Sequence, residues 1–443
     1  MARKDPGAGE SGGAGSIAEL VGRARLEPPE GEDPVLETVH LAALVEGSER
    51  PVARVAALGR IVQTAFRLGR AGDCLAALDR QREAAGDDPP ALVWALTSSA
   101  VCRSSFAQLD RARADLAEVR RLCHHAAPLL AEPFWRFAET VCNWLEGNWA
   151  AAHAGATRLD EEQGSPISPA ISGTVTALRV ELMRGLGLAQ ECGPLAERLT
   201  SAEPAEMSAW ALAGLDADAG RPGDALRRVA EVCDVGARSV YRTALPLVLH
   251  RMAEIAFRQG DQDVTSFAAG ALAGLDQAAP LNEILAGLAH SYATRDPGPA
   301  VRALEVAEAA GAGMLAAEAL TAAGQVGDLA ALPAAHAAWS RFGAPGKARA
   351  VAAAMRAAGL PVPLAHYRAG QSPAADPAAL TARERALCRL VHEGRTNQQI
   401  ARAQHISVKT VEAYLTRVYR KTECSSRVEL AVAVTERRIQ LDD

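Results

Sequence analysis

One pattern recurs along most of the chain: an amphipathic run of about ten to fifteen residues, a short break, and another such run. The clearest breaks contain glycine and are Gly72-Asp73, Gly147-Asn148, Gly223-Asp224, Gly260-Asp261 and Gly298-Pro299. Their glycines are 75, 76, 37 and 38 residues apart, so a period of about 37 to 38 residues fits them all if each long interval holds two units. Further breaks are then expected near Asp110 and near residues 185–187. A chain with this pattern folds as consecutive short helices.

The composition favours the same fold class. The apolar residues, 49% of the chain, are largely Ala, Leu and Val, and aromatic residues make up only 4%, which suits helices better than β-sandwiches or barrels. We therefore predict an all-α protein. The period resembles that of tetratricopeptide-type helical hairpins, slightly lengthened. The sequence predicts a solenoid of such pairs over residues 34–359, and the alternative is a non-repetitive helical domain, because Ala-rich helices resemble one another by chance.

Composition also divides the chain into segments. Residues 1–33 are rich in Gly, Pro and Glu, and we expect them to form a disordered arm. Residues 360–379 contain four prolines and are expected to be a linker that no helix continues through. Residues 380–443 carry 12 Arg and Lys against 8 Asp and Glu, whereas the rest of the chain carries 35 against 45. A basic end on an acidic body suggests a nucleic-acid partner for that end.

Four short helices are predicted in residues 380–443 from their N-terminal capping residues. The expected capping residues are Thr381 with Glu384, Thr396 with Gln399, Ser426 with Glu429, and Ser407 alone. The helices they begin are residues 383–392, 397–404, 408–421 and 426–438, and Gly394 ends the first. A long basic helix joined to a shorter one by a tight turn is typical of a helix-turn-helix.

This segment resembles the LuxR (GerE-type) DNA-binding domain over about 60 residues. The matching residues are Leu380 to Arg385, Leu390-Val391, Gly394, Thr396-Asn397, Ile400-Ala401, Ile406-Ser407, Lys409 to Glu412, Leu415, and Ser426 to Leu430. Tyr414 stands where His is common, and Glu423-Cys424 where Gly-Val is common. The domain order resembles the C-terminal half of the large ATP-binding LuxR regulators without their ATPase module, since the sequence has no GxxxxGK[ST] loop.

The resemblance implies a third helix that lies in the major groove of double-stranded DNA. It places Glu412, Ala413 and Thr416 at base-facing positions and assigns backbone phosphates to Lys409, Thr410, Arg417 and Lys421; Thr396, Asn397 and Ser407 complete the DNA-binding candidates. Helical geometry agrees, because Val411, Leu415 and Val418 fall on the side opposite to Glu412. In this family the last helix commonly pairs with its copy, so we expect a homodimer on DNA, with simple core packing of that helix as the alternative.

Aromatic residues gather in the first half of the repeats, namely Trp94, Trp135, Phe137, Trp144 and Trp149. Such residues usually fill a core. A ligand groove on the concave face of the solenoid is the alternative, because this face commonly binds peptides or partner proteins.

No feature of the sequence predicts an enzyme. The eight cysteines are scattered without zinc-type spacing and are expected to be reduced core residues. His124-His125 and Asp160-Glu161-Glu162 lack a nucleophile or a metal partner, so we expect no catalytic site, metal or cofactor. No uncharged apolar run reaches about 18 residues, and the first 33 residues lack a signal-type apolar core. We expect a cytoplasmic protein without membrane contact.

The sequence therefore predicts a bacterial transcription regulator. Its helical-repeat domain would receive a protein or small-molecule signal, and RNA polymerase or another protein is a further candidate partner. The alternative is a helical-repeat interaction scaffold with a helix-turn-helix that does not bind DNA. Glu412 on the expected reading face and the net charge of −6 suggest that alternative.

Overall fold

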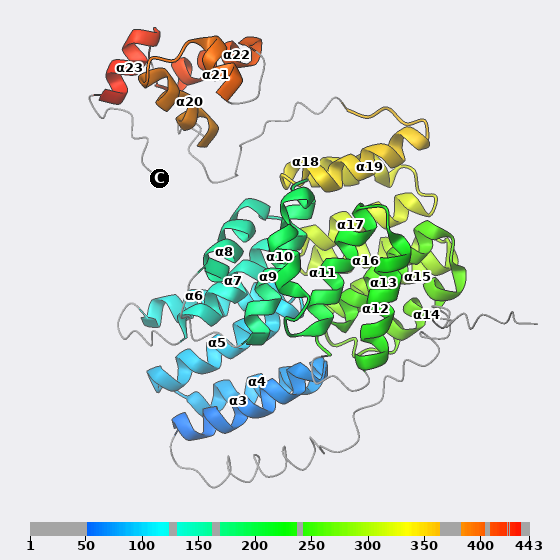
Figure 1. Ribbon diagram of the computed structural model, residues 1–443. Helices are drawn as coiled ribbons and strands as arrows, with labels where there is room; N and C mark the ends of the chain where they lie inside the picture. Colours follow the sequence, from blue (N-terminus) through cyan, green and yellow to red (C-terminus); the bar gives the residue numbers. More distant parts are fainter. Residues whose placement is uncertain are drawn as a thin grey trace, which may run out of the picture. The chain divides into compact units, whose positions relative to one another are not determined.

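The computed structural model describes residues 51–123, 131–161, 169–236, 242–363, 382–403, 408–422, 424 and 426–435. These residues form helices and contain no strand, which confirms the all-α prediction. The chain divides into two compact units, Met1–Ala365 and His366–Asp443, which are described separately (Figure 1). The predicted arm, residues 1–33, lies outside the described residues, as does most of the predicted linker.

The described residues of the larger unit form a succession of helices. Its first helices are α3 (Pro51–Arg67), α4 (Ala71–Ala85), α5 (Pro89–Ser105), α6 (Leu109–Cys123), α7 (Glu132–Glu146), α8 (Trp149–Glu161), α9 (Pro169–Gly185) and α10 (Gly193–Leu199). Its remaining helices are α11 (Ala205–Asp218), α12 (Pro222–Gly236), α13 (Leu245–Gln259), α14 (Gln262–Ala273), α15 (Pro280–Thr294), α16 (Gly298–Ala309), α17 (Gly313–Gln325), α18 (Ala331–Arg341) and α19 (Pro345–Ala357). A 3-10 turn, η1 (Ala189–Glu191), precedes α10.

Each turn that joins an odd-numbered helix to the next, from α3 through α16, contains one residue with a left-handed backbone. These residues are Gly69, Ala107, Gly147, Gly187, Gly220, Gly260 and Arg295. Successive positions lie 33 to 40 residues apart, close to the spacing in the sequence pattern. A left-handed residue after a helix redirects the chain while its neighbours satisfy the last carbonyl groups, so each pair forms a tight hairpin.

Two of the predicted Gly-Asp breaks are displaced from the real turns. Gly260 has φ +75° and ends α13, and the side chain of Asp261 accepts from the Val264 amide at 3.1 Å, as expected of a turn that also caps the next helix. Gly72 and Gly223, however, lie inside the first turns of α4 and α12, and the preceding helices end near positions 69 and 220. The amide groups of a first helical turn lack intrahelical partners, so glycine is tolerated there.

Consecutive hairpins pack side by side. Within the larger unit α5 contacts α3 and α7, α13 contacts α11 and α15, and each of these odd-numbered helices also packs against its even-numbered partner. Successive odd-numbered helices thus pack against one another, and each even-numbered helix packs against its odd-numbered neighbours, which is consistent with a tetratricopeptide-like array.

The last helices of the array contact helices that lie five hairpins earlier in the chain. Helix α17 packs against α7, and α19 packs against α9. Glycines allow these helices to approach closely: a Cβ atom on Gly147 would lie 2.5 Å from the ring of Phe342, and one on Gly346 would lie 2.5 Å from the carbonyl oxygen of Arg184. Neither distance is sterically possible, so glycine is required at both contacts.

Hydrogen bonds also join the first hairpins to the middle of the array. The amide of Gly72 donates to Asp276 Oδ2 at 2.7 Å, and the amide of Leu281 donates to the carbonyl oxygen of Phe106 at 3.2 Å. These bonds link segments more than 170 residues apart in sequence. The start of α4 and the end of α5 are therefore fastened to the segment between α14 and α15.

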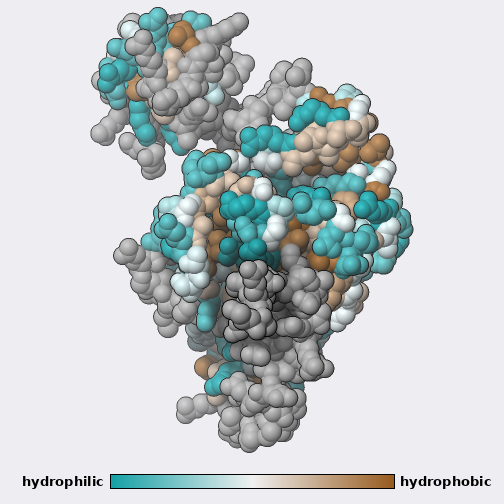
Figure 2. Space-filling model, turned by 45° about the vertical axis from the view of Figure 1, so that its right-hand side comes forward, coloured by the Kyte–Doolittle hydropathy of each residue, from teal (hydrophilic) through white to brown (hydrophobic). Residues whose placement is uncertain are grey.

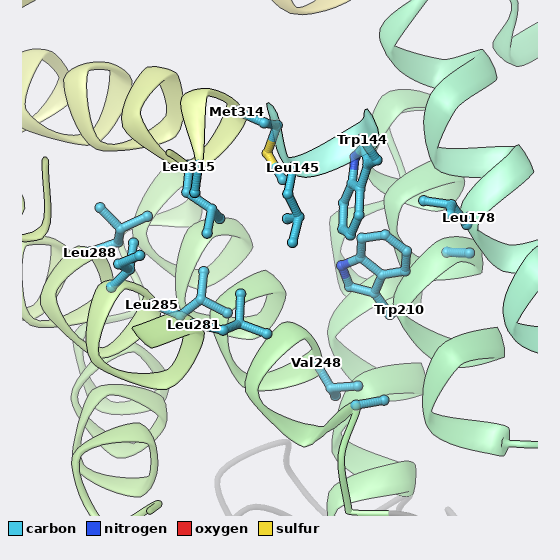
Figure 3. Close-up of a cluster of buried hydrophobic side chains, with 14 of the residues drawn as sticks. Trp144, Leu145, Leu178, Trp210, Val248, Leu281, Leu285, Leu288, Met314 and Leu315 are labelled. Carbon is cyan, nitrogen blue, oxygen red and sulfur yellow. The ribbon is translucent and has the colours of Figure 1, made fainter. Parts of the chain in front are cut away.

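A continuous hydrophobic core fills the interior of the array (Figure 3). Trp144 packs edge-on against Trp210 with ring centroids 5.8 Å apart, and Trp149 packs in the same way against Trp339 at 5.8 Å. Phe137 is buried too, so three of the five clustered aromatic residues belong to the core, as most such residues do, and do not line an open groove. All eight cysteines are unpaired, and seven are buried, which confirms their assignment to the core.

The visible surface shows hydrophilic and hydrophobic residues interspersed over the larger unit (Figure 2). The exposed large hydrophobic side chains among the described residues are Val52, Trp94, Val301, Leu329 and Val408. They lie on separate elements, which is ordinary for a protein surface. None of the described helices is both long and apolar enough to cross a lipid bilayer.

Candidate nucleic-acid interface

Four helices build the smaller unit: α20 (Ala382–His392), α21 (Asn397–Ala403), α22 (Val408–Thr422) and α23 (Arg427–Thr435). Wherever the structure describes their ends, these lie within one residue of the predicted positions, apart from the end of α23, since residues 436–443 are outside the described part. Helix α22 packs against α20 and α21, and α23 packs against α20. Leu387, Val391 and Ile400 form the core with α22, as predicted.

The N-terminus of α21 has the predicted capping box. The amide of Gln399 donates to Thr396 Oγ1 at 3.3 Å, and Gln399 Oε1 accepts from the Thr396 amide at 2.8 Å. At α23 the amide of Glu429 donates to Ser426 Oγ at 3.2 Å, which is the first half of the second predicted box. Thr381 and Ser407, the other two predicted caps, lie outside the described residues.

Gly394 ends α20 as the sequence predicts. Its φ is +76°, a left-handed conformation in which a side chain is disfavoured. The amide of Gly394 donates to the carbonyl oxygen of Val391, and the amide of Arg395 donates to that of Leu390, both at 3.0 Å. This closure turns the chain directly into α21.

Helix α22 is amphipathic. Val411, Leu415 and Val418 are buried in the core of the smaller unit, whereas Glu412 is exposed. Seven of the predicted DNA-binding residues belong to this helix, namely Lys409, Thr410, Glu412, Ala413, Thr416, Arg417 and Lys421. Positions 409 and 416 lie one helical turn before and after Glu412, hence on the same side of the helix backbone. The apolar side of α22 is thus used for packing within the smaller unit.

The other DNA-binding candidates lie next to α21. Thr396 precedes its first turn as the capping residue, and Asn397 is its first residue. The structure therefore brings the start of α21 and helix α22 together in one small unit, as a helix-turn-helix requires.

Arg427 lies in the segment that resembles the LuxR domain, but it is not among the predicted DNA-binding residues. It is the first residue of α23, and its Nη1 donates to Asn397 Oδ1 at 3.2 Å while its Nη2 donates to the backbone carbonyl oxygen of Arg395. Arg427 also lies near Tyr419: burial raises the pKa of that phenol, and the guanidinium of Arg427 opposes the increase. The family pattern contains positions 397 and 427 but does not indicate that they touch, so only the fold reveals this contact.

In the larger unit the carboxylate of Asp160 joins three helices. Its carboxylate, almost fully buried, accepts from Arg179 and Arg198 at 2.6 Å each and from Thr176 Oγ1 at 2.9 Å. Burial would raise the pKa of Asp160, but the hydrogen bonds from Arg198, Thr176 and Arg179 outweigh that effect and lower it. This carboxylate is thus occupied in tying α8 to α9 and α10. His124-His125 and Glu162 lie outside the described residues.

A cluster of charged side chains, mostly buried but with Asp218 and Arg258 exposed, lies where α9, α11, α13, α17 and α19 meet. Its members are Glu181, Arg184, Asp218, Arg251, Glu254, Arg258, Glu318 and Lys347, four acidic and four basic. Lys347 Nζ lies 2.6 Å from Glu318 Oε1 and 5.5 Å from the ring centroid of Trp339. With its charges balanced pairwise, the cluster acts as an internal brace between neighbouring hairpins.

The comparisons with known proteins concern the smaller unit. Residues 378–434 match the family described as bacterial regulatory proteins, luxR family. A monoamine regulon transcriptional regulator of Klebsiella aerogenes is 46% identical over 54 residues, which is 12% of this chain and 24% of that regulator. The chain thus spans about a quarter of the length of that relative, and no solved structure matches. Residues 378–434 are a helix-turn-helix DNA-binding domain of the luxR family.

Proposed function

We propose that this protein is a cytoplasmic transcription regulator that binds specific DNA sites through α22 while its helical array receives a protein or small-molecule signal. The luxR-family match over residues 378–434 is the observation that carries the proposal. The amphipathic character of α22 supports it, because the buried Val411, Leu415 and Val418 orient the opposite side outward. The function we propose needs no enzymatic step.

Each group of residues has its own task on DNA. Lys409, Thr410, Arg417 and Lys421 would contact backbone phosphates, which position the domain without reading sequence. Glu412 would accept a hydrogen bond from cytosine N4, and Ala413 and Thr416 would contact the thymine methyl group in the major groove. Thr396, Asn397 and Ser407 would hold phosphates beside the groove.

Two copies of the chain would bind together. We propose pairing through α23, whose Leu430 and Ala433 are buried within their own unit while Val434 is only half-buried. Paired domains read two half-sites, so the operator would be palindromic. Contact with RNA polymerase or another protein would then convert binding into regulation.

Selection of duplexes from a random pool by the full chain tests the proposal. We expect an enriched palindromic motif, with affinity that falls steeply as salt increases because phosphate contacts release counterions. A scrambled duplex of the same length is the control. Enrichment of no motif, with equal binding of all duplexes, would instead support the scaffold with an inactive helix-turn-helix.

A further inference from the structure

The contact between Arg427 and Asn397 determines how the Asn397 amide is presented. Asn397 Oδ1 accepts from Arg427 Nη1 at 3.2 Å. An asparagine amide has one acceptor end and one donor end, on opposite sides of the same carbon. With the oxygen bound to α23, the Nδ2 amino group is directed away from Arg427.

We propose that Arg427 is a positioning residue for DNA binding: it holds the Asn397 amide so that Nδ2 donates to a backbone phosphate. The inference rests on the proposed function, which places Asn397 beside the DNA backbone. A phosphate offers only acceptors, so an amide that presented its oxygen instead would repel it. The positive charge of Arg427 disfavours that reversed orientation, because its guanidinium has no acceptor for the amino group.

Arg427 acts through Asn397 rather than on the phosphate itself. Its side chain is half-buried, and Nη2 is bound to the carbonyl oxygen of Arg395 in the turn before α21. The guanidinium thus fastens the turn, at Arg395, and the first residue of α21, Asn397, to α23. Loss of Arg427 would release both the turn and the amide that it presents.

Replacing Asn397 by aspartate separates positioning from stability. Asn397→Asp keeps an acceptor for Arg427 and turns the contact into an ion pair, but it removes the donor and adds a negative charge facing the phosphate. We expect a melting temperature equal to or above that of the wild type. The Kd for a selected duplex should increase by roughly ten- to a hundredfold. Asn397→Ala should weaken binding less than Asn397→Asp. Wild-type affinity in Asn397→Asp would overturn the proposal.

A double-mutant cycle tests the action of Arg427. Arg427→Ala should weaken duplex binding about tenfold in the wild-type background but less than about twofold in the Asn397→Ala background. If Arg427 bound a phosphate itself, the loss would be equal in both backgrounds and the salt slope would fall by about one. That result would contradict the proposal.

Two controls keep the outcome interpretable. Arg395→Ala removes a positive charge from the same turn. The Arg395 side chain lies 3.4 Å from Glu393 and makes no contact with Asn397 among those described. Its effect on duplex affinity should be small and equal in the wild-type and Asn397→Ala backgrounds. Arg427→Lys keeps the charge but loses the planar guanidinium that donates to two acceptors at once, so it should retain the fold and still weaken duplex binding. If the wild type binds no duplex, the proposed function has failed; if only the Asn397 and Arg427 results disagree, the positioning role has failed.

Discussion

At the scale of single residues, the interior of the array depends on charges that the sequence does not reveal. Glu181 lies 3.1 Å from Arg251 and 3.8 Å from Lys347, and it also pairs with Arg184. Only the last pair is close in sequence. The hydrophobic pattern predicts which residues are buried, but the partners of a buried carboxylate depend on contacts between hairpins and had to come from the structure.

Removing the charge of Glu181 should destabilise the array. Glu181→Gln leaves the buried cations near it without their shared partner, and we expect a loss of about 3 to 5 kcal/mol in the free energy of unfolding. Glu161→Gln is the matched control: its partner Arg179 lies 3.2 Å away, but Glu161 is exposed, so the expected loss is below about 1 kcal/mol. All six tryptophans lie in the larger unit, so denaturant titration followed by tryptophan fluorescence compares the two variants.

The same residue makes the stability of the array depend on acid. Burial alone would raise the pKa of Glu181, but the positive charges of Arg184, Arg251 and Lys347 lower it to about 2. Since this pKa is lower in the folded than in the unfolded state, the stabilisation is complete above the unfolded pKa, near 4.3, and is lost as the pH falls towards 2.

We expect the wild type to lose stability steeply between pH 4.3 and 2. In that window the difference in unfolding free energy between the wild type and Glu181→Gln should shrink. A difference that stayed constant from pH 6 to pH 3 would contradict this assignment of the charge.

At the scale of helices and turns, the local sequence predicts where the short helices of the smaller unit begin and end. The capping box of Thr396 and Gln399 and the terminating Gly394 were predicted correctly, because a cap depends on residues within one helical turn. The hairpin turns were located less well. Gly223 and Gly260 look alike in sequence, since each precedes an aspartate, but only Gly260 has a left-handed backbone.

Alanine substitution should distinguish these two glycines. Gly260→Ala forces a Cβ atom into a left-handed residue and should cost about 1 to 2 kcal/mol of unfolding free energy. Gly223→Ala is the matched control: it lies in the first turn of α12 with open space around it, so alanine should be neutral or stabilise by up to about 1 kcal/mol. Equal effects in thermal unfolding would mean that the turn assignment is wrong.

Different residues of helix α22 should determine the affinity for DNA and the preference among sequences. Lys409→Ala is expected to weaken all duplexes to a similar degree and to reduce the salt slope, because it removes a phosphate contact. Glu412→Ala and Thr416→Ala should change the preference at one base pair by roughly 1 to 3 kcal/mol. Binding to all single-base variants of the selected operator measures both effects. An unchanged preference in both variants would remove direct base reading by these residues.

At the scale of the whole molecule, the sequence pattern indicated a helical array but did not predict how the larger unit closes. Periodicity records which face of each helix is apolar, whereas the curvature of an array depends on small rotations between successive hairpins. The contact of α17 with α7 joins two hairpins that are separated along the chain by four others, and no local signal marks it. The DNA-binding helix could be predicted because it lies within about 60 residues of continuous pattern.

Helix α19, the last helix of the larger unit, offers a test of this closure. Gly346→Val places side-chain atoms against the carbonyl oxygens of Arg184 and Gly185, which lie 2.5 and 2.8 Å from the position of a Cβ atom. We expect α19 to detach from α9, with amide hydrogen exchange at least about tenfold faster in α19 while α11 to α15 stay protected. Gly193→Val, in open space at the start of α10, is the control. Unchanged exchange in α19 would contradict the observed contact.

The contact between α7 and α17 also has a consequence for folding during synthesis. Leu145 of α7 lies beside Met314 of α17, in the region where these two helices pack together (Figure 3). The ribosome makes α17 about 170 residues after α7, which at roughly 5 to 20 residues per second is a delay of roughly 8 to 34 seconds. During that interval the part of the α7 surface that α17 covers in the folded protein lacks its partner. Slow translation of the middle hairpins would therefore prolong the time for which apolar side chains such as Leu145 stay uncovered and prone to aggregation.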